Sequence, residues 1–137
     1  MWVGRGWWEL KLARGWQAQD DPECLTVTKS SDGALQLSGA LKSGGGLVSP
    51  AEIHEFYGLS VPSGAPIDPT TFGSFRGFRT HFAEDGIYWH KFWLYHGSLL
   101  VLVTYNGTAD AWRAESEEVF AMLRSLRIRE LGEGPAQ

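Results

Sequence analysis

The chain has 137 residues, of which 43% are hydrophobic and 13% aromatic, and this composition supplies enough apolar surface for one folded core. Its net charge of −4 offers no positive field to neutralise phosphates, so we do not expect DNA or RNA as a partner. The longest apolar run, residues 99–103, is far shorter than the roughly 20 residues of a membrane helix. Residues 1–10 show no signal-peptide pattern. We therefore expect a soluble, cytoplasmic protein that does not insert into membranes.

The chain is expected to form a single domain over residues 1–130. Residues 131–137 make a polar tail that contains glycine and proline, and we expect this tail to fray. The only cysteine, Cys24, excludes an internal disulfide and is typical of a small buried hydrophobe.

The N-terminal third alternates apolar and polar residues with the period of a β-strand. The first such run covers residues 7–12, and the second, residues 24–28, is rich in β-branched residues. A Ser-Asp-Gly turn at 31–33 then leads into a return strand at 34–41. These runs together predict an antiparallel meander.

A short helix is predicted after a glycine-rich loop. Ser49 is an N-cap residue, Pro50 suits the first helical position, and Glu52 completes a capping box. Residues 61–69 contain three prolines and predict a loop. The strand pattern returns at Thr71.

The next part of the chain predicts two hairpins. Turn signals at 84–86 (Glu-Asp-Gly) and 95–97 (Tyr-His-Gly) divide residues 75–105 into adjacent antiparallel strands. Residues 99–103 are apolar on both faces, which is typical of a central strand covered on both sides.

The clearest helix follows, with Thr108 or Asp110 as its N-cap. We expect Arg113, Glu115, Glu117, Glu118 and Arg124 on its polar side. Its apolar face is predicted to carry Trp112, Val119, Phe120, Leu123 and Leu126. The whole element order predicts an α+β protein with an antiparallel β-sheet of about six strands flanked by helices.

Four segments carry a family resemblance: Trp-Glu-Leu-Lys-Leu-Ala-Arg-Gly-Trp at 8–16, Gly-Ala-Leu-Gln-Leu-Ser at 33–38, Leu-Val-Thr-Tyr-Asn at 102–106 and Leu-Arg-Ser-Leu at 123–126. In these segments the chain resembles the Mog1/PsbP-like family, and we place it beside the uncharacterised bacterial members. Arg14 stands where members often have a proline. The resemblance implies an α/β/α sandwich and a binding module, because members include a partner of a small GTPase and extrinsic subunits of photosystem II. Binding residues differ between branches, so no site residue is transferred.

The histidines suggest a metal hypothesis. If residues 85–86 form a two-residue turn, His81 lies directly opposite His90, with Cβ atoms roughly 4.5–5.5 Å apart. Two imidazoles at this separation can share a metal ion. A third ligand is not evident, because His96 lies on the next turn and His54 on the short helix. The alternative is a stacked or solvated histidine pair without metal.

A candidate binding surface comes from rings and cations on the two strands that flank the 84–86 turn. The same register places Arg79 beside Phe92 on one face, and Phe82 beside Trp89, Phe78 beside Trp93 and Thr80 beside Lys91 on the other. Flat rings and cations are common at recognition surfaces. Packing under the helices is the alternative explanation for the rings. The candidate binding residues are Arg76, Arg79, Trp89, Lys91 and Trp93.

No residue receives a catalytic role. The sequence has no Gly-x-Ser-x-Gly elbow, and no Gly-Lys-Ser/Thr follows the glycine run at 44–46. We therefore expect a non-enzymatic protein-interaction module without a cofactor, an adaptor or immunity-type protein of bacteria whose partner is another protein. The main alternative is a small-molecule-binding or cofactor-free enzyme domain with a tryptophan-lined cavity. A metal-dependent protein that uses His81 and His90 is the third hypothesis.

Overall fold

The computed structural model describes residues 1–129 except 31, 43, 45 and 58–60. The tail predicted at 131–137 lies outside the described residues. The elements in chain order are β1 (Trp2–Arg5), β2 (Trp8–Lys11), β3 (Gln17–Asp20), β4 (Leu25–Thr28), β5 (Gly33–Leu41), α1 (Pro50–Tyr57), β6 (Ile67–Phe72), β7 (Phe75–Glu84), β8 (Ile87–His96), β9 (Leu99–Gly107), α2 (Ala109–Arg124) and β10 (Arg127–Ile128).

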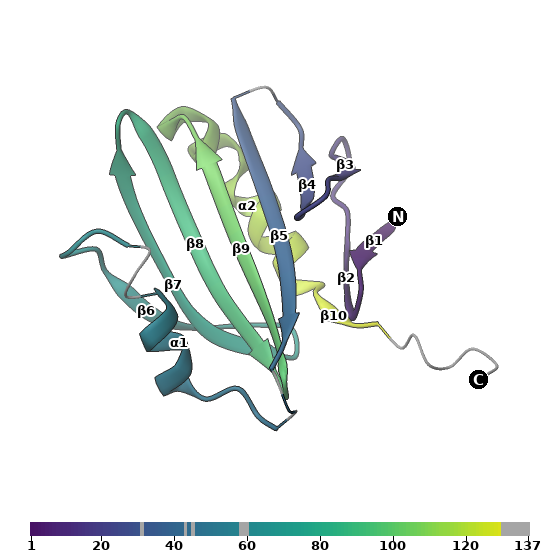
Figure 1. The fold of residues 1–137 in the computed structure, drawn as a ribbon. Helices are drawn as coiled ribbons and strands as arrows, with labels where there is room; N and C mark the ends of the chain where they lie inside the picture. Colours follow the sequence, from purple (N-terminus) through teal and green to yellow (C-terminus); the bar gives the residue numbers. More distant parts are fainter. Residues whose placement is uncertain (31, 43, 45, 58–60, 130–137) are drawn as a thin grey trace.

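The described strands form two sheets (Figure 1). The large one has seven strands in the order β3-β4-β5-β9-β8-β7-β6, and β1, β2 and β10 form the small one. All the strand pairs are antiparallel. The α+β class with an antiparallel sheet is therefore confirmed, and β9 takes the predicted central position.

The β7–β8 hairpin has the predicted register. Glu84 pairs with Ile87, and the turn residues Asp85 and Gly86 have φ angles of 55° and 79°. These left-handed values are those of a type I′ turn, whose twist matches the twist of the flanking strands. The turn thereby determines which side chains of β7 and β8 share a face.

The predicted N-terminal meander is only partly correct. The β4–β5 hairpin is present, but the first predicted strand, observed as β2, pairs with β1 and β10 instead of joining the large sheet. The edge beside β4 is taken by β3. Trp8 and Leu10 of β2 are buried in the core. Alternation of apolar and polar residues indicates that a strand has one buried face, but it does not identify the strand that pairs with it.

Strand β6 begins at Ile67, inside the segment predicted as a loop. It lies at the edge of the sheet and pairs only with β7. An edge strand needs backbone donors on one side only, so it tolerates Pro69. The prolines of this segment were therefore a misleading loop signal.

Both helices begin with the predicted type of cap. At α1, Ser49 N donates to Glu52 Oε1 at 2.9 Å and Glu52 N donates to Ser49 Oγ at 3.2 Å, which is the capping box. At α2, Ala111 N donates to Thr108 Oγ1 at 3.0 Å, so Thr108 is the N-cap. Neither helix of the described chain is long and apolar enough to cross a membrane.

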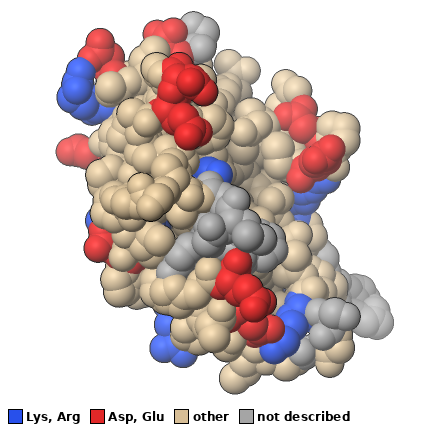
Figure 2. Space-filling model, turned by 60° about the vertical axis from the view of Figure 1, so that its left-hand side comes forward, with Lys and Arg blue, Asp and Glu red and all other residues tan. Residues whose placement is uncertain are grey.

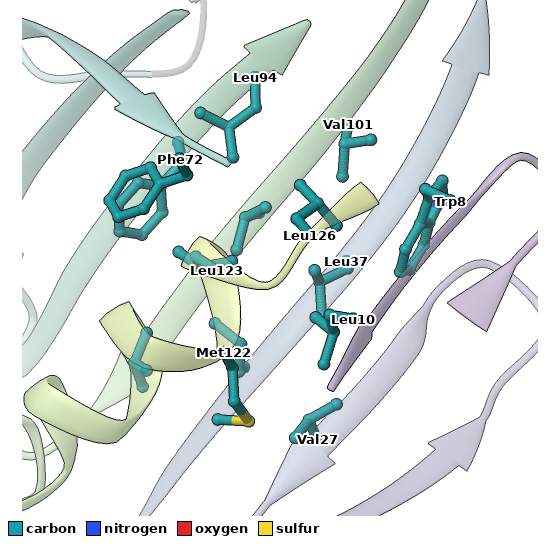
Figure 3. Packing of buried hydrophobic residues seen from close by; sticks show 14 of the residues in the cluster. Trp8, Leu10, Val27, Leu37, Phe72, Leu94, Val101, Met122, Leu123 and Leu126 are labelled. Carbon is teal, nitrogen blue, oxygen red and sulfur yellow. The ribbon is translucent and has the colours of Figure 1, made fainter. Parts of the chain in front are cut away.

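The core lies between one face of the large sheet and a layer made of α2 and the small sheet. Leu126 follows the end of α2 but is still buried. Figure 3 shows part of this packing, with Leu37, Leu94 and Val101 of the sheet near Met122, Leu123, Leu126, Trp8 and Leu10. The other face of the sheet is covered at one end by α1 (Figure 1).

Glu115 is not on the polar side of α2, where it was expected. Its side chain is only 4% exposed, and it accepts hydrogen bonds from Tyr105 Oη at 2.7 Å and Ser30 Oγ at 2.9 Å. Burial and the hydrogen bond to Glu115 raise the pKa of Tyr105 above its ordinary value. The carboxylate thus joins α2 to β9 and to the segment that follows β4.

Candidate functional site

The sheet separates the predicted binding residues. Arg79 pairs with Phe92, which belongs to the core under α2. Its guanidinium carbon lies 5.5 Å from the ring centroid of Phe120 in α2. Arg79 therefore lies on the α2 face, whereas Arg76, Trp89 and Lys91 lie on the face that carries α1.

Trp93 is on the face of α1, but it is only 3% exposed. Val48 and Ile53, which lie just before and within α1, form a buried cluster with it. The expectation that Trp93 is a surface contact is therefore wrong. Its position in β8 was correctly derived, but strand periodicity does not indicate where a distant helix covers the sheet.

The end of this face away from α1 carries a group of side chains that we call the open face: Gln36, Phe82, Trp89, Lys91, Thr104 and Asn106. On the face that carries α1, Figure 1 shows no helix over these ends of β5, β9 and β8; α2 lies behind them, on the other face. Phe82 and Trp89 stack across the hairpin, with ring centroids 6.3 Å apart and planes at 16°. The Lys91 ammonium lies 5.9 Å and 5.6 Å from these two centroids.

Neutral polar groups complete the open face. Lys91 pairs with Thr104, Trp89 pairs with Asn106, and Thr104 in turn pairs with Gln36. Asn106 Nδ2 donates to Gln36 Oε1 at 3.4 Å. Burial lowers the pKa of Lys91 from its ordinary value. The surface therefore combines stacked rings, a partly desolvated ammonium and neutral hydrogen-bonding groups.

A second feature lies at the opposite end of the same face. Two hollows of about 530 and 540 Å³ share Thr71, Arg76 and Tyr95. Strand pairing accounts for this row, because Arg76 pairs with Thr71 of β6 and with Tyr95 of β8. We call the joined hollows the Arg76 cleft. The residues that line it include Leu47, Val48, Thr71, Ser74, Arg76 and Tyr95.

The sequence analysis missed Thr71 and Tyr95 as partners of Arg76. Counting back from the 84–86 turn places Tyr95 opposite Arg76, so that partner was available from the hairpin register. Thr71 was not, because residues 67–69 of β6 were predicted as a loop and the strand pattern that begins at Thr71 was not paired with Arg76.

The predicted pairing of His81 with His90 is confirmed, and their ring centroids are 5.6 Å apart. His90 is 5% exposed and stacks between Phe92 and Trp112, with centroid separations of 4.7 Å and 4.6 Å. Tyr88 Oη lies 3.1 Å from His90 Nδ1. His90 is therefore packed into the aromatic layer under α2, whereas His81 is exposed.

This setting favours a neutral imidazole at His90. Burial, followed by the charges of Arg79 and His81, lowers its pKa to about 3. Within the described ranges, no group of three or more His, Cys, Asp or Glu residues is placed to hold a metal ion. The stacked-pair alternative fits this arrangement better than a metal centre does.

No known family profile matches the sequence, and no curated protein gives a significant match. Solved structures do share the fold. A Bacteroides thetaiotaomicron protein has a TM-score of 0.63 at 14% identity over 92% of this chain, but this chain spans only 46% of that protein. Cyanobacterial PsbP (CyanoP) of Synechocystis has a TM-score of 0.57 at 11% identity, covering 89% of this chain and 86% of that one.

LpqN of Mycobacterium tuberculosis, described as involved in cell envelope biogenesis, has a TM-score of 0.56 at 11% identity. The match covers 90% of this chain and 83% of LpqN. PsbP and LpqN have Mog1/PsbP-like folds. The chain therefore has the Mog1/PsbP-like fold that its sequence resemblance implied, and identities this low say nothing of its activity.

Proposed function

We propose that this protein is a non-enzymatic protein-interaction module, an adaptor or immunity-type protein of bacteria, and that it binds a partner protein through the open face. The observation that carries the proposal is the Phe82–Trp89 stack beside the Lys91 ammonium. Rings held in place by strand pairing supply contact area with little further loss of side-chain freedom. Aromatic residues are also enriched in the centres of protein interfaces.

The neighbouring polar groups suit the same role. Thr104, Asn106 and Gln36 are uncharged, so covering them with a partner requires new hydrogen bonds but no desolvation of a full charge. Lys91 is the only charged member of the open face, and its partial burial already reduces its hydration. A partner surface with apolar groups and backbone carbonyls would match this pattern.

The alternative of a small-molecule-binding or cofactor-free enzyme domain receives less support from the geometry. Its enzyme version requires an ionisable group that is open to a ligand. The buried groups suited to that role are Glu115, which is held by Tyr105 and Ser30, and His90, which stacks between two rings. Hydrogen bonds account for Glu115 as part of the core, and ring stacking accounts for the burial of His90, whose Nε2 has no hydrogen-bond partner among the described residues.

The test is capture of partner proteins from a lysate of the source organism with tagged wild-type protein and the variants Trp89→Ala and Lys91→Ala. Trp7→Ala is the matched control, because Trp7 is 46% exposed but lies on the β1–β2 turn. We expect wild type and control to recover the same partner, and the two open-face variants to recover it at least about tenfold less.

Equal recovery of that partner by all four proteins, each folded as judged by a cooperative thermal transition, would show that the open face is not the binding surface. A copurifying small molecule without any protein partner would favour the alternative function.

A further inference from the structure

Arg76 occupies an unusual electrostatic position. Its side chain is exposed, and within the described part of the chain its guanidinium makes no hydrogen bond or ion pair. The guanidinium carbon lies 5.9 Å from the centroid of the Tyr95 ring, a cation–π distance. The hydrogen-bond donors of the guanidinium are therefore available to a ligand.

The Arg76 cleft is also locally cationic in a protein of net charge −4. Among the described residues that line it, Arg76 is the only one with a formal charge at neutral pH, counting His96 as neutral, and none carries a carboxylate. Figure 2 shows that charged side chains form only scattered groups on the visible side of the molecule. An anion in the cleft would thus meet attraction, and no carboxylate among these lining residues would repel it.

The arginine side of the cleft is built on paired strands. Arg76 lies in the cross-strand row Thr71–Arg76–Tyr95, so its backbone is held on both sides. The turn next to it is held by His96, whose Nδ1 donates to the carbonyl oxygen of Ser74 at 2.9 Å. Strand pairing therefore fixes the backbone that carries Arg76, so binding a ligand requires ordering of the side chain but not of the backbone.

The residues that line the Arg76 cleft indicate which chemical group would bind there. Thr71, Ser74 and Tyr95 contribute hydroxyl groups to the lining. Leu47 and Val48 form an apolar wall, and the side chain of Leu47 is 75% exposed. One guanidinium balances one negative charge and can donate two parallel hydrogen bonds to a planar oxyanion. A carboxylate has that charge and shape, whereas a phosphate dianion would remain half-neutralised.

We infer that the Arg76 cleft binds a carboxylate that is attached to an apolar group, with the carboxylate on Arg76 and the apolar group against Leu47 and Val48. The inference goes beyond the proposed function, because the Arg76 cleft lies at the opposite end of the sheet face from the open face. The carboxylate can come from a free carboxylic acid or from a peptide.

The first experiment uses 3-phenylpropionate and its uncharged analogue, 3-phenylpropionamide, as probes in an NMR titration of the ¹⁵N-labelled full chain. We expect the acid to shift backbone amides of residues 71–76 and 95–97, and to bind at least about tenfold more tightly than the amide. Arg76→Gln should weaken acid binding by about the same factor. Arg14→Gln, which changes an exposed arginine outside the cleft, should leave it unchanged.

The inference is overturned if the acid shifts none of these amides, if acid and amide bind equally, or if Arg76→Gln binds the acid as wild type does. Because Arg76 is exposed, a well-dispersed spectrum is expected for the variant. Arg76→Lys keeps the charge without the planar fork, and a partial loss of affinity would support the two-hydrogen-bond geometry.

A second arm identifies the source of the carboxylate. Acetyl-Leu-Phe with a free C-terminus that binds more tightly than 3-phenylpropionate, and more tightly than its C-terminal amide, would indicate a peptide. The reverse order would indicate a free acid. Lys91→Ala, which tests the proposed function, should not change acid binding, so each idea can fail without the other.

Discussion

Tyr105 donates a hydrogen bond to Glu115 across the boundary between the central strand β9 and helix α2, with an oxygen–oxygen distance of 2.7 Å. Both side chains are buried, and Ser30 donates to the second oxygen of the same carboxylate. A buried carboxylate is costly unless it is hydrogen-bonded, so this contact specifies how α2 lies on the sheet.

Tyr105→Phe is expected to lower the free energy of unfolding by about 1–3 kcal/mol, because it removes a donor from a buried carboxylate. Urea denaturation measures the change. The control is Glu117→Gln, on the exposed side of the same helix, which should change stability by less than about 0.5 kcal/mol. A Tyr105→Phe protein as stable as the control would mean that the hydrogen bond contributes nothing.

The stability of the protein should depend on pH through His90. Its pKa is lowered from 6.5 to about 3 in the folded state. Between these values the unfolded chain binds a proton that the folded protein does not, so His90 makes stability fall as the pH falls through this window.

His90→Phe should therefore reduce the pH dependence of the unfolding free energy within that window by up to about 1.4 kcal/mol per pH unit. Denaturation curves at several pH values give the slopes for the variant and for wild type. Parallel slopes for His90→Phe and wild type would show that His90 is not held neutral.

The two tryptophans of β8 should respond differently to truncation. Trp93→Ala removes a buried ring from under α1 and should cost about 3–5 kcal/mol. Trp89→Ala, on the open face, should cost about 1 kcal/mol or less. Thermal and urea unfolding of both variants provide the comparison, and equal losses would contradict the assignment of Trp89 to a surface.

Gly73 should tolerate a methyl group less well than Gly64. Both have left-handed φ angles, 60° and 90°, but a Cβ on Gly73 would lie 2.7 Å from the carbonyl oxygen of Leu126, whereas Gly64 has open space. Gly64→Ala should cost about 1 kcal/mol from backbone strain alone. Gly73→Ala should cost at least about 1 kcal/mol more, because a backbone oxygen cannot move aside. Equal denaturation midpoints would argue against this close approach.

The candidate site was only partly accessible to prediction. Counting from the Asp85–Gly86 turn placed Phe82 beside Trp89 and Arg79 on the other face, because side chains alternate strictly along paired strands. The same count did not show which side chains of the sheet are covered by a helix. Trp93 is buried and Trp89 is not because α1 packs over only one end of the sheet. The row Thr71–Arg76–Tyr95 exists because the edge strand β6 pairs with β7.

The hairpins from β7 to β9, the capping box of α1 and the cap of α2 were predictable because each depends on residues a few positions apart, where turn geometry and backbone hydrogen bonding act directly. Other features join residues that are far apart in the chain: the pairing of β5 with β9, the separate sheet of β1, β2 and β10, and the burial of Glu115. These features were decided by tertiary packing, since the sequence pattern marks a face as apolar or polar and only the folded core selects what lies against it.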